Sequence, residues 1–366
     1  MKTIHLGPEE VRKVSSILAN GGIVALPTET VYGLAGNAFS SECALKIFHA
    51  KERPSFDPLI THVSEELLSK PGGTLKALGE AGVIHPSTTT WKAAPLIERV
   101  MHEFWPGPLT LILPRGSNIP DEVTSGSPRV GVRMPEHPLF QEVLSLTGFP
   151  LAAPSANRFG RISPTTAAHV TAELEGRIDA VLDGGPCSVG VESTILSLEE
   201  SDGELIATLL RPGKISRAEL ELSLGVPVGD GVGLGEKNQK IEAPGMLDQH
   251  YAPVKPLFLY PGPFPSRDHL DHWIGEFGLN GIPAFLCQNL KSAELLRPGD
   301  FRSVLTQGSD PEAAARALFS ALRSLDEDSS ISFIIAELPE TSEEGLVSAI
   351  ADRLNRASVN KPLLKR

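Results

Sequence analysis

Two cations separated by one residue are the first feature of this sequence that could do chemistry. Lys51 and Arg53 stand just before Pro54, which disfavours helical geometry for Arg53. In extended backbone, side chains two positions apart point to the same side, so this spacing would bring both cations together. Clustered cations beside the end of a strand are what a polyphosphate requires. The spacing therefore predicts a phosphate-binding site.

A turn rich in hydroxyl groups precedes these cations, and a histidine follows them. The apolar run 23–26 leads into the turn at 27–34, which contains Thr28 and Thr30. A second apolar run, 59–63, carries His62. A histidine on an apolar strand is more often a core residue than a ligand-binding one. From the residues alone, both interpretations of His62 remain open.

Together with later motifs, these residues resemble the YrdC family, the L-threonylcarbamoyladenylate synthases. Each motif alone is weak evidence, but six of them in the family's order are specific. The matching segments are KERP at 51–54, FWPGPLT at 104–110, VGVRMP at 130–135, APSAN at 153–157, GVEST at 190–194 and LRPG at 210–213. A further block, APGMLDQHYAP at 243–253, resembles the linker of the family's long, two-domain form.

The resemblance implies an enzyme that transfers a nucleotidyl group. It would join L-threonine, bicarbonate and ATP into L-threonylcarbamoyl-AMP and release pyrophosphate, the first step of threonylcarbamoyladenosine formation in tRNA. Mg²⁺ is expected to accompany ATP, with no metal ligands assigned to the protein. A separate tRNA threonylcarbamoyl transferase complex would use the product. Positioning and neutralisation of phosphate charge supply most of the catalysis in such a transfer.

The family's site positions carry over to this chain residue by residue. The expected catalytic cations are Lys51 and Arg53. The positions implied for threonine are Thr30, His62, Arg133, Ala153 and Ser193. The positions implied for ATP are Arg53, Asp57, Arg129, Ser155, Ser163, Arg211 and Tyr251.

Several of these residue types suit the implied roles, and some depart from the family pattern. Arg133, at the end of a predicted strand, could pair with the threonine carboxylate through two hydrogen bonds. Ser163 before Pro164 is also a natural helix N-cap. Ser155 lacks the G-x-S-x-G context of a serine nucleophile. Asp57 stands where the family commonly has Asn, and Arg129 stands where a small polar residue is usual, so that any ATP contact there would use its backbone.

Short apolar runs that alternate with amphipathic segments predict an α/β protein of two domains. In residues 1–224 the expected strands are 23–26, 59–63, 109–113, 129–133, 151–153, 180–182, 194–198 and 206–210, and the expected helices are 8–20, 40–51, 137–147 and 165–175. These form a YrdC-like domain with a mixed twisted sheet. Residues 256–366 alternate between strand and helix, which indicates a smaller Rossmann-like α/β domain without a G-x-G-x-x-G motif.

The segment between the domains, 225–255, has the composition of a linker. Glycines stand at positions 225, 229, 231, 233 and 235 without helical or strand periodicity. The segment is longer than an ordinary connection, and it ends in apolar and aromatic residues. We therefore expect it to fold over the first domain as a lid, with Tyr251 closing the ATP site.

Charge and cysteine usage narrow the class of protein. The formal net charge is −12 over 366 residues, which disfavours a protein that binds nucleic acids without sequence specificity. We therefore expect no strong direct binding of tRNA. Three widely separated cysteines form neither a disulfide framework nor a zinc motif. Without a signal-like N-terminus or an apolar run of about 20 residues, a cytoplasmic protein without a membrane span is expected.

Two other functions compete with the synthase interpretation. One is a carbamoyl-adenylate-forming enzyme, but the additional modules that such proteins use have no counterpart in this sequence. The other is a non-enzymatic RNA-binding translation factor, which the acidic net charge disfavours.

Overall fold

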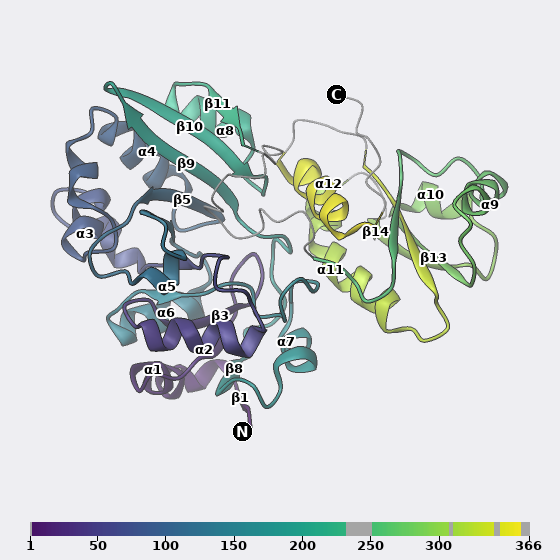
Figure 1. Cartoon of the computed structure of the whole chain (residues 1–366), viewed down its shortest axis with the longest axis horizontal. Coiled ribbons are helices and arrows are strands. Elements are labelled where there is room, and N and C mark those ends of the chain that lie inside the picture. Colours follow the sequence, from purple (N-terminus) through teal and green to yellow (C-terminus); the bar gives the residue numbers. More distant parts are fainter. Residues whose placement is uncertain (1, 232–250, 307–309, 340–344, 360–366) are drawn as a thin grey trace.

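The computed structural model describes residues 2–231, 251–306, 310–339 and 345–359, which form two α/β domains side by side (Figure 1). The first contains an eleven-stranded sheet of mixed direction, and the second contains a four-stranded sheet whose paired strands are all parallel. The predicted fold class, a mixed-sheet α/β domain followed by a smaller Rossmann-like one, is confirmed.

The first domain is built from many short strands. Their bounds are β1 Ile4–Leu6, β2 Val24–Leu26, β3 Gly33–Asn37, β4 Ile60–His62, β5 Leu109–Pro114, β6 Arg129–Arg133, β7 Leu151–Ala152, β8 Ala180–Leu182, β9 Thr194–Ser201, β10 Glu204–Arg211 and β11 Val228–Asp230. They lie in the order β1-β8-β2-β3-β7-β4-β6-β5-β9-β10-β11. β4 and β6 are central neighbours, so their carboxyl ends lie in the middle of the domain.

Helices cover this sheet and bury its apolar side chains. Their bounds are α1 Val11–Ala19, α2 Ser41–Lys51, α3 Thr74–Glu80, α4 Ala94–Phe104, α5 Asp121–Thr124, α6 Pro138–Thr147, α7 Ala167–Leu174 and α8 Arg217–Leu224, with 3-10 turns at Pro8–Glu10, Glu65–Ser69 and Pro86–Thr90. α2 begins at a capped end, since the Ser40 hydroxyl accepts from Cys43 N at 3.2 Å. This helix ends at the first of the two cations.

The second domain repeats a strand-helix pattern. Its elements are β12 Leu257–Tyr260, α9 Arg267–Glu276, β13 Pro283–Asn289, α10 Leu290–Glu294, β14 Phe301–Thr306, α11 Pro311–Glu327, β15 Phe333–Glu337 and α12 Gly345–Ala357. The strand order is β12-β15-β13-β14. Within the described residues, no helix of either domain has the length and apolar composition needed to cross a membrane.

The structure also contains elements that the sequence pattern did not indicate. These are β1, β3, α3, α4, α5, α8, β11, α10 and β14. The sequence of β3 is GLAGN, and its two glycines have a low propensity for strands. Most of the others are very short, so they present too few residues for a clear period. α4 begins at the end of the stretch 75–95, whose sequence shows no clear helical or strand periodicity.

The predicted linker and lid, 225–255, lies largely outside the described residues, since 232–250 are not described. At its start, β11 pairs in parallel with β10, so residues 228–230 belong to the sheet of the first domain. At its end, Ala252 N donates to Gly160 O at 2.8 Å, which ties this end to a loop of the first domain.

The two domains share a continuous apolar contact. Val31 and Val191 of the first domain cluster with Phe319 of α11 and Ile350 of α12. Gly190 has a φ of +85°, and a Cβ placed there would lie 2.4 Å from the Arg316 Cα. Because only glycine fits that approach, the GVEST motif is also the surface on which α11 packs.

Candidate active site

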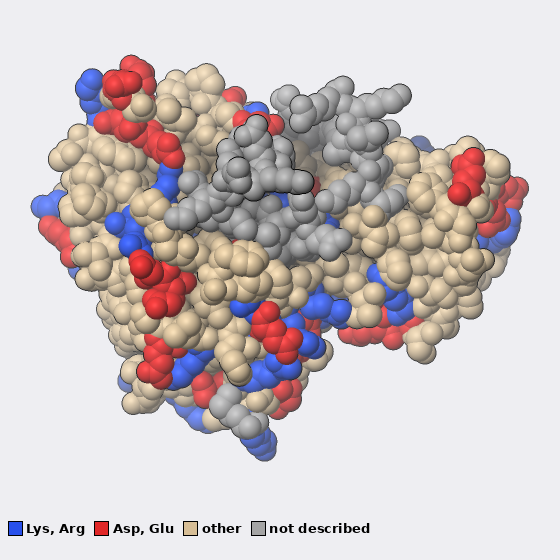
Figure 2. Space-filling model, viewed as in Figure 1, with Lys and Arg blue, Asp and Glu red and all other residues tan. Residues whose placement is uncertain are grey.

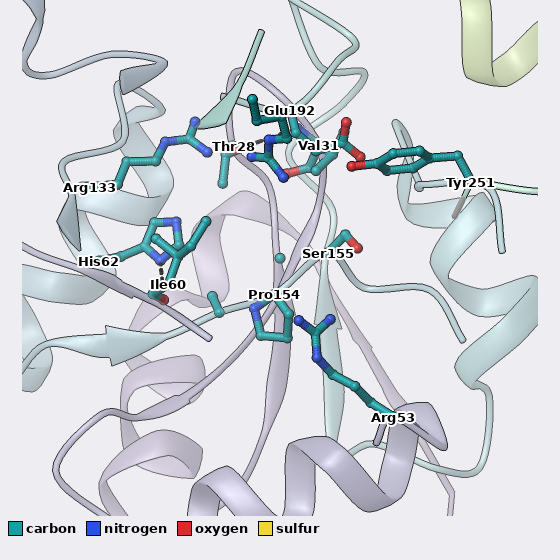
Figure 3. A pocket seen from close by; sticks show the side chains of 13 residues that line it. Thr28, Val31, Arg53, Ile60, His62, Arg133, Pro154, Ser155, Glu192 and Tyr251 are labelled. Atoms are coloured by element: carbon teal, nitrogen blue, oxygen red, sulfur yellow. Dashed lines mark hydrogen bonds between the residues drawn. The ribbon is translucent and has the colours of Figure 1, made fainter. Parts of the chain in front are cut away.

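Most residues singled out by the family resemblance converge on one pocket of the first domain, and Tyr251 closes one side of it (Figure 3). The lining residues are Thr28, Val31, Gly33, Arg53, Ile60, His62, Arg133, Ala153, Pro154, Ser155, Glu192, Arg211 and Tyr251. The pocket lies at the carboxyl ends of β4 and β6, where open α/β sheets bind their ligands.

The strand register places two residues that were predicted to bind threonine side by side. β4 and β6 pair in parallel, with His62 opposite Arg133. Both residues end their strands, and both line the pocket. The His62 ring lies 5.1 Å from the ring of Phe140 in α6. Its Nδ1 lies 3.1 Å from Ile60 O, and since a carbonyl can only accept, Nδ1 carries the proton.

Arg133 is held by a carboxylate and retains donor capacity. Its Nη2 lies 2.7 Å from Oε1 of Glu29, and both side chains are buried. The other oxygen of Glu29 accepts from Glu136 N at 3.2 Å. Among the described residues, nothing accepts a hydrogen bond from Arg133 Nε. A buried donor without a partner costs about 1–3 kcal/mol, so a carboxylate that enters the pocket would gain by meeting it.

His62 stays neutral at physiological pH. Burial, reinforced by the positive charge of Arg133, lowers the pKa of His62 to about 3. The unfolded chain binds this proton near pH 6.5, so folding opposes protonation. The stability that a neutral His62 contributes is therefore fully present above pH 6.5, and it is lost progressively as the pH falls from 6.5 towards 3.

We predict that this loss is visible as a pH-dependent difference between wild type and His62→Gln. Denaturant unfolding at several pH values should give a constant difference in unfolding free energy from pH 7 to 8. Below pH 6.5 wild type should lose stability relative to the variant by up to about 1.4 kcal/mol per pH unit. A difference that stays flat down to pH 4.5 would mean that His62 titrates alike in both states.

The predicted phosphate end of the pocket contains Arg53. Glu52, with a φ of 53°, ends α2 in the left-handed region. The two cations are therefore not joined by extended backbone, and their side chains diverge. Arg53 donates from Nε to Asp57 O at 3.1 Å and from Nη2 to Pro58 O at 2.9 Å. These bonds fix the guanidinium in the pocket wall.

Lys51 does not line the pocket, although it was expected to be catalytic with Arg53. Its Nζ donates to the carbonyl oxygens of Ser155 and Asn157. Burial, together with the charge of Arg53, lowers the pKa of Lys51 well below its usual range. In this arrangement Lys51 fixes the turn that carries Ser155.

Asp57 forms an ion pair with Arg53, with 2.9 Å between Oδ2 and Nη2. Both side chains are buried, and burial raises the pKa of Asp57 although nearby cations oppose the shift. Neither carboxylate oxygen forms a hydrogen bond with another described residue. A carboxylate here offsets part of the positive charge that Arg53 would present to a polyphosphate.

Replacing Asp57 with Asn should therefore strengthen ATP binding. The shape is retained, and a repulsion of about 1–2 kcal/mol between the carboxylate and a phosphate is removed. We expect the KM for ATP to fall several-fold. The matched control is Glu52→Gln, which removes the same charge from an exposed neighbour that pairs with Arg158 and Arg177. A rise in the KM of Asp57→Asn would instead assign the carboxylate a positive role.

Three further polar residues that were predicted to bind substrates lie in or behind the pocket wall. Arg211 donates from Nε to Ser193 O and from Nη2 to Ser193 Oγ, both at 3.1 Å. Ser193 Oγ also lies 2.8 Å from Thr110 Oγ1. Thr30 contacts Thr28 through their hydroxyl oxygens at 2.9 Å, and Thr28 rather than Thr30 lines the pocket. Arg211 therefore lines the pocket, while Ser193 and Thr30 support it.

Arg129 is a predicted site residue that the structure places outside the pocket lining. It begins β6, whereas Arg133 ends that strand. Its Nη2 donates to Ile112 O and Leu198 O, both at 2.9 Å, and it forms an ion pair with Glu199. The side chain therefore bridges strands of the sheet and does not line the pocket.

Tyr251, the described end of the predicted lid, is buried against both domains. Its ring stacks on Phe319 of α11 with centroids 5.8 Å apart, and the guanidinium carbon of Arg353 lies 5.4 Å from its centroid. Burial raises the pKa of Tyr251, so its hydroxyl stays protonated. The structure thus brings Tyr251 to the predicted ATP site, where it lines the pocket.

Sequence reasoning missed Arg353 of the second domain, which contacts Glu192 in the pocket wall. Ser163, predicted for ATP, donates to Glu192 Oε1 at 2.5 Å. The other oxygen of Glu192 is 2.9 Å from Nε of Arg353 in α12. Arg353 lies in the buried stripe that contains Leu346, Ile350 and Leu354, and a charged residue in such a stripe is a detectable signal.

Two family models together match nearly the whole chain. The Sua5/YciO/YrdC model, described as "Telomere recombination", matches residues 16–213. The model described as "Threonylcarbamoyl-AMP synthase, C-terminal domain" matches residues 215–359.

Curated relatives and a solved structure agree with these models. The chain is similar to the threonylcarbamoyl-AMP synthase of Bacillus subtilis, with 37% identity over 95% of this chain and 93% of the relative. It is also similar to that of Pyrococcus abyssi, with 34% identity over 95% and 94%. The crystal structure of P. abyssi Sua5 complexed with L-threonine superposes with a TM-score of 0.81 at 32% identity, covering 99% of this chain and 98% of that one.

Proposed function

The chain belongs to the Sua5/YciO/YrdC family, in the form that ends in a threonylcarbamoyl-AMP synthase C-terminal domain, and we propose that the pocket described above is its active site. As a threonylcarbamoyl-AMP synthase, it is an enzyme that joins L-threonine, bicarbonate and ATP and releases pyrophosphate.

The observation that supports this assignment most strongly is that one pocket has two ends of complementary chemistry. At one end, the register of β4 and β6 places His62 beside Arg133, whose guanidinium suits an α-carboxylate. At the other end, Arg53 and Arg211 present positive charge suited to phosphates. The pocket therefore carries groups suited to an amino-acid carboxylate and to phosphates, and Figure 3 shows Arg133 and Arg53 on opposite sides of it.

The chemistry follows from bringing these two substrates together. Threonine's amine adds to bicarbonate and gives a carbamate and water. A carbamate oxygen attacks the α-phosphorus of ATP, the bond to the β-phosphate oxygen breaks, and pyrophosphate leaves. Arg53 and Arg211 would neutralise charge on the phosphates, while Lys51 would keep the Ser155 turn in place. Arg133 would orient the amino acid for in-line attack.

We propose that Mg²⁺ enters as a partner of the ATP phosphates, which neutralises charge on the leaving pyrophosphate. Among the described residues, no group of three or more His, Cys, Asp and Glu side chains could hold a metal ion. Glu192 lines the pocket and Asp57 lies against Arg53, and both carboxylates already pair with arginines. In the part of the chain that the structure describes, no metal site therefore exists that could be filled without ATP.

The product is proposed to pass to a tRNA threonylcarbamoyl transferase in the cytoplasm, without tight binding of tRNA by this protein. On the face shown in Figure 2, the described Lys and Arg side chains are interspersed with Asp and Glu. Such mixed charge, with a net charge of −12, does not favour counterion release from a nucleic acid.

The test is an omission series on the purified protein. Pyrophosphate release from ATP should require both threonine and bicarbonate, because the carbamate is the nucleophile. Serine should be a poorer substrate by about 1–3 kcal/mol, because a pocket that holds the threonine methyl loses that contact. Release of ADP and phosphate in place of pyrophosphate would overturn the assignment.

A further inference from the structure

A buried ion pair joins the second domain to the wall of the pocket. Arg353 is 1% exposed and lies on α12. It donates from Nε to Glu192 Oε2 at 2.9 Å, from Nη1 to Pro212 O at 2.7 Å and from Nη2 to Glu192 O at 3.3 Å. One guanidinium thus holds both the side chain and the backbone of Glu192.

The packing of α12 leaves this arginine little freedom. The first residue of α12, Gly345, approaches the first domain so closely that an added Cβ would lie 2.6 Å from Lys214 O. Asp352 accepts from Arg353 Nη1 at 3.1 Å on the same helix. The Tyr251 ring lies beside the guanidinium. Arg353 is therefore fixed in place from several sides.

Glu192 is an acidic residue of the pocket wall, and its charge interacts with that of Arg211, one of the two arginines proposed to bind phosphates. It lines the pocket together with Arg53 and Arg211. Burial favours its neutral form, but the charges of Arg353 and Arg211 outweigh burial, and the pKa of Glu192 is lowered. A buried carboxylate that faced a polyphosphate without compensation would repel it. Arg353 supplies the larger part of that compensation from the second domain, and Arg211 supplies the rest from the first.

We propose that Arg353 is a positioning residue for the ATP end of the site. It neutralises Glu192 and directs one oxygen of that carboxylate to the domain interface, while the other oxygen holds the Ser163 hydroxyl. Without the C-terminal domain, only Arg211 would remain to offset the negative charge of Glu192 in the pocket wall. The second domain is thereby part of the electrostatics of the site, an inference that rests on the function proposed above.

The test is a double-mutant comparison with ATP binding and kinetics as readouts. Arg353→Met should raise the Kd and the KM for ATP by at least about tenfold, because it strands Glu192. The KM for threonine should change much less. Arg353→Met combined with Glu192→Gln should restore ATP affinity to within a few-fold of wild type, because the harmful charge is gone. Arg353→Lys should rescue only part of the loss, because its donors lack the fork geometry.

A second arginine provides a matched control for domain docking. Arg323 of α11 is also buried at the interface, donates to Ile162 O and forms an ion pair with Glu173 at 2.5 Å, and it does not line the pocket. Arg323→Met should lower the unfolding temperature without the tenfold change in ATP affinity. Equal losses of ATP affinity in both variants, or no rescue by Glu192→Gln, would reduce Arg353 to a docking residue.

Folding and activity are separated within the same experiment. If Arg353→Met does not fold, ATP binding is measured on the double variant Arg353→Met with Glu192→Gln. This variant is expected to fold, because an uncharged replacement of a buried ion pair is often as stable as the pair itself. If that folded pair still binds ATP tenfold more weakly, the proposal is wrong. ATP binding is measured by calorimetry without threonine. This binding measurement tests the role of Arg353. Pyrophosphate release by the wild-type protein tests the proposed reaction separately.

Discussion

Arg133→Ala is expected to weaken threonine binding by roughly 2–5 kcal/mol, the usual effect of removing one partner of a buried charged pair. Arg133 is the last residue of β6, and its guanidinium forms an ion pair with Glu29. Among the described residues, nothing accepts a hydrogen bond from its Nε. ATP binding should change by a few-fold at most. Calorimetry with each substrate separately measures both effects.

Two further variants separate loss of the threonine contact from damage to the fold. Arg133→Lys should recover only part of the affinity, because a lysine lacks the planar fork. Arg133→Met with Glu29→Gln removes both charges, so it should fold well and still bind threonine poorly. Unchanged threonine affinity in folded Arg133→Ala would remove this arginine from the site.

Tyr251→Ala is expected to raise the KM for ATP by about tenfold, while the KM for threonine changes little. The ring fills one side of the pocket and stacks on Phe319, so truncation would admit water to the phosphate end. Loss of a buried aromatic ring should also lower the unfolding free energy by about 3–5 kcal/mol. Steady-state kinetics and denaturant unfolding measure these effects.

Tyr251→Phe distinguishes the ring from its hydroxyl group. This variant keeps the stacking on Phe319 and should retain most of the ATP affinity. Phe319→Leu offers a control on the other side of the stack, because it loosens the packing without changing a pocket-lining residue. A normal KM for ATP in Tyr251→Ala, in protein that is folded at the assay temperature, would leave Tyr251 as an interface residue alone.

The main residues of the pocket could be predicted because they stand in or beside motifs that resemble those of a known family. Arg133 ends the expected strand 129–133, whereas His62 was expected inside the strand 59–63 and in fact ends it. Their neighbouring positions could not be expected, since these depend on the parallel pairing of β4 with β6 across about 70 residues. Register between distant strands is fixed by tertiary packing, which no local pattern reports.

Two site residues show how local patterns mislead. Arg129 and Arg133 are four residues apart on one strand, so their side chains leave the same face but at opposite ends. Only Arg133 reaches the pocket. Lys51 and Arg53 were expected to point together from extended backbone, but the left-handed Glu52 between them sends each to a different partner.

The contribution of the second domain was the largest gap in the sequence-based account. Arg353 and Arg323 belong to no motif, and each lies in a helix of otherwise ordinary composition. Each interrupts an apolar stripe, which indicates a buried arginine but not its partner. Glu192 and Glu173, those partners, lie about 150 residues earlier in the chain.

The most direct test of the central claim is the mass of the product formed with labelled bicarbonate. Incubation with ATP, threonine and ¹³C-bicarbonate should yield a compound that contains threonine, one labelled carbon and AMP, together with an equal amount of pyrophosphate. Unlabelled bicarbonate should give the same compound one mass unit lighter. A product in which AMP is joined directly to threonine, without the labelled carbon, would contradict the assignment.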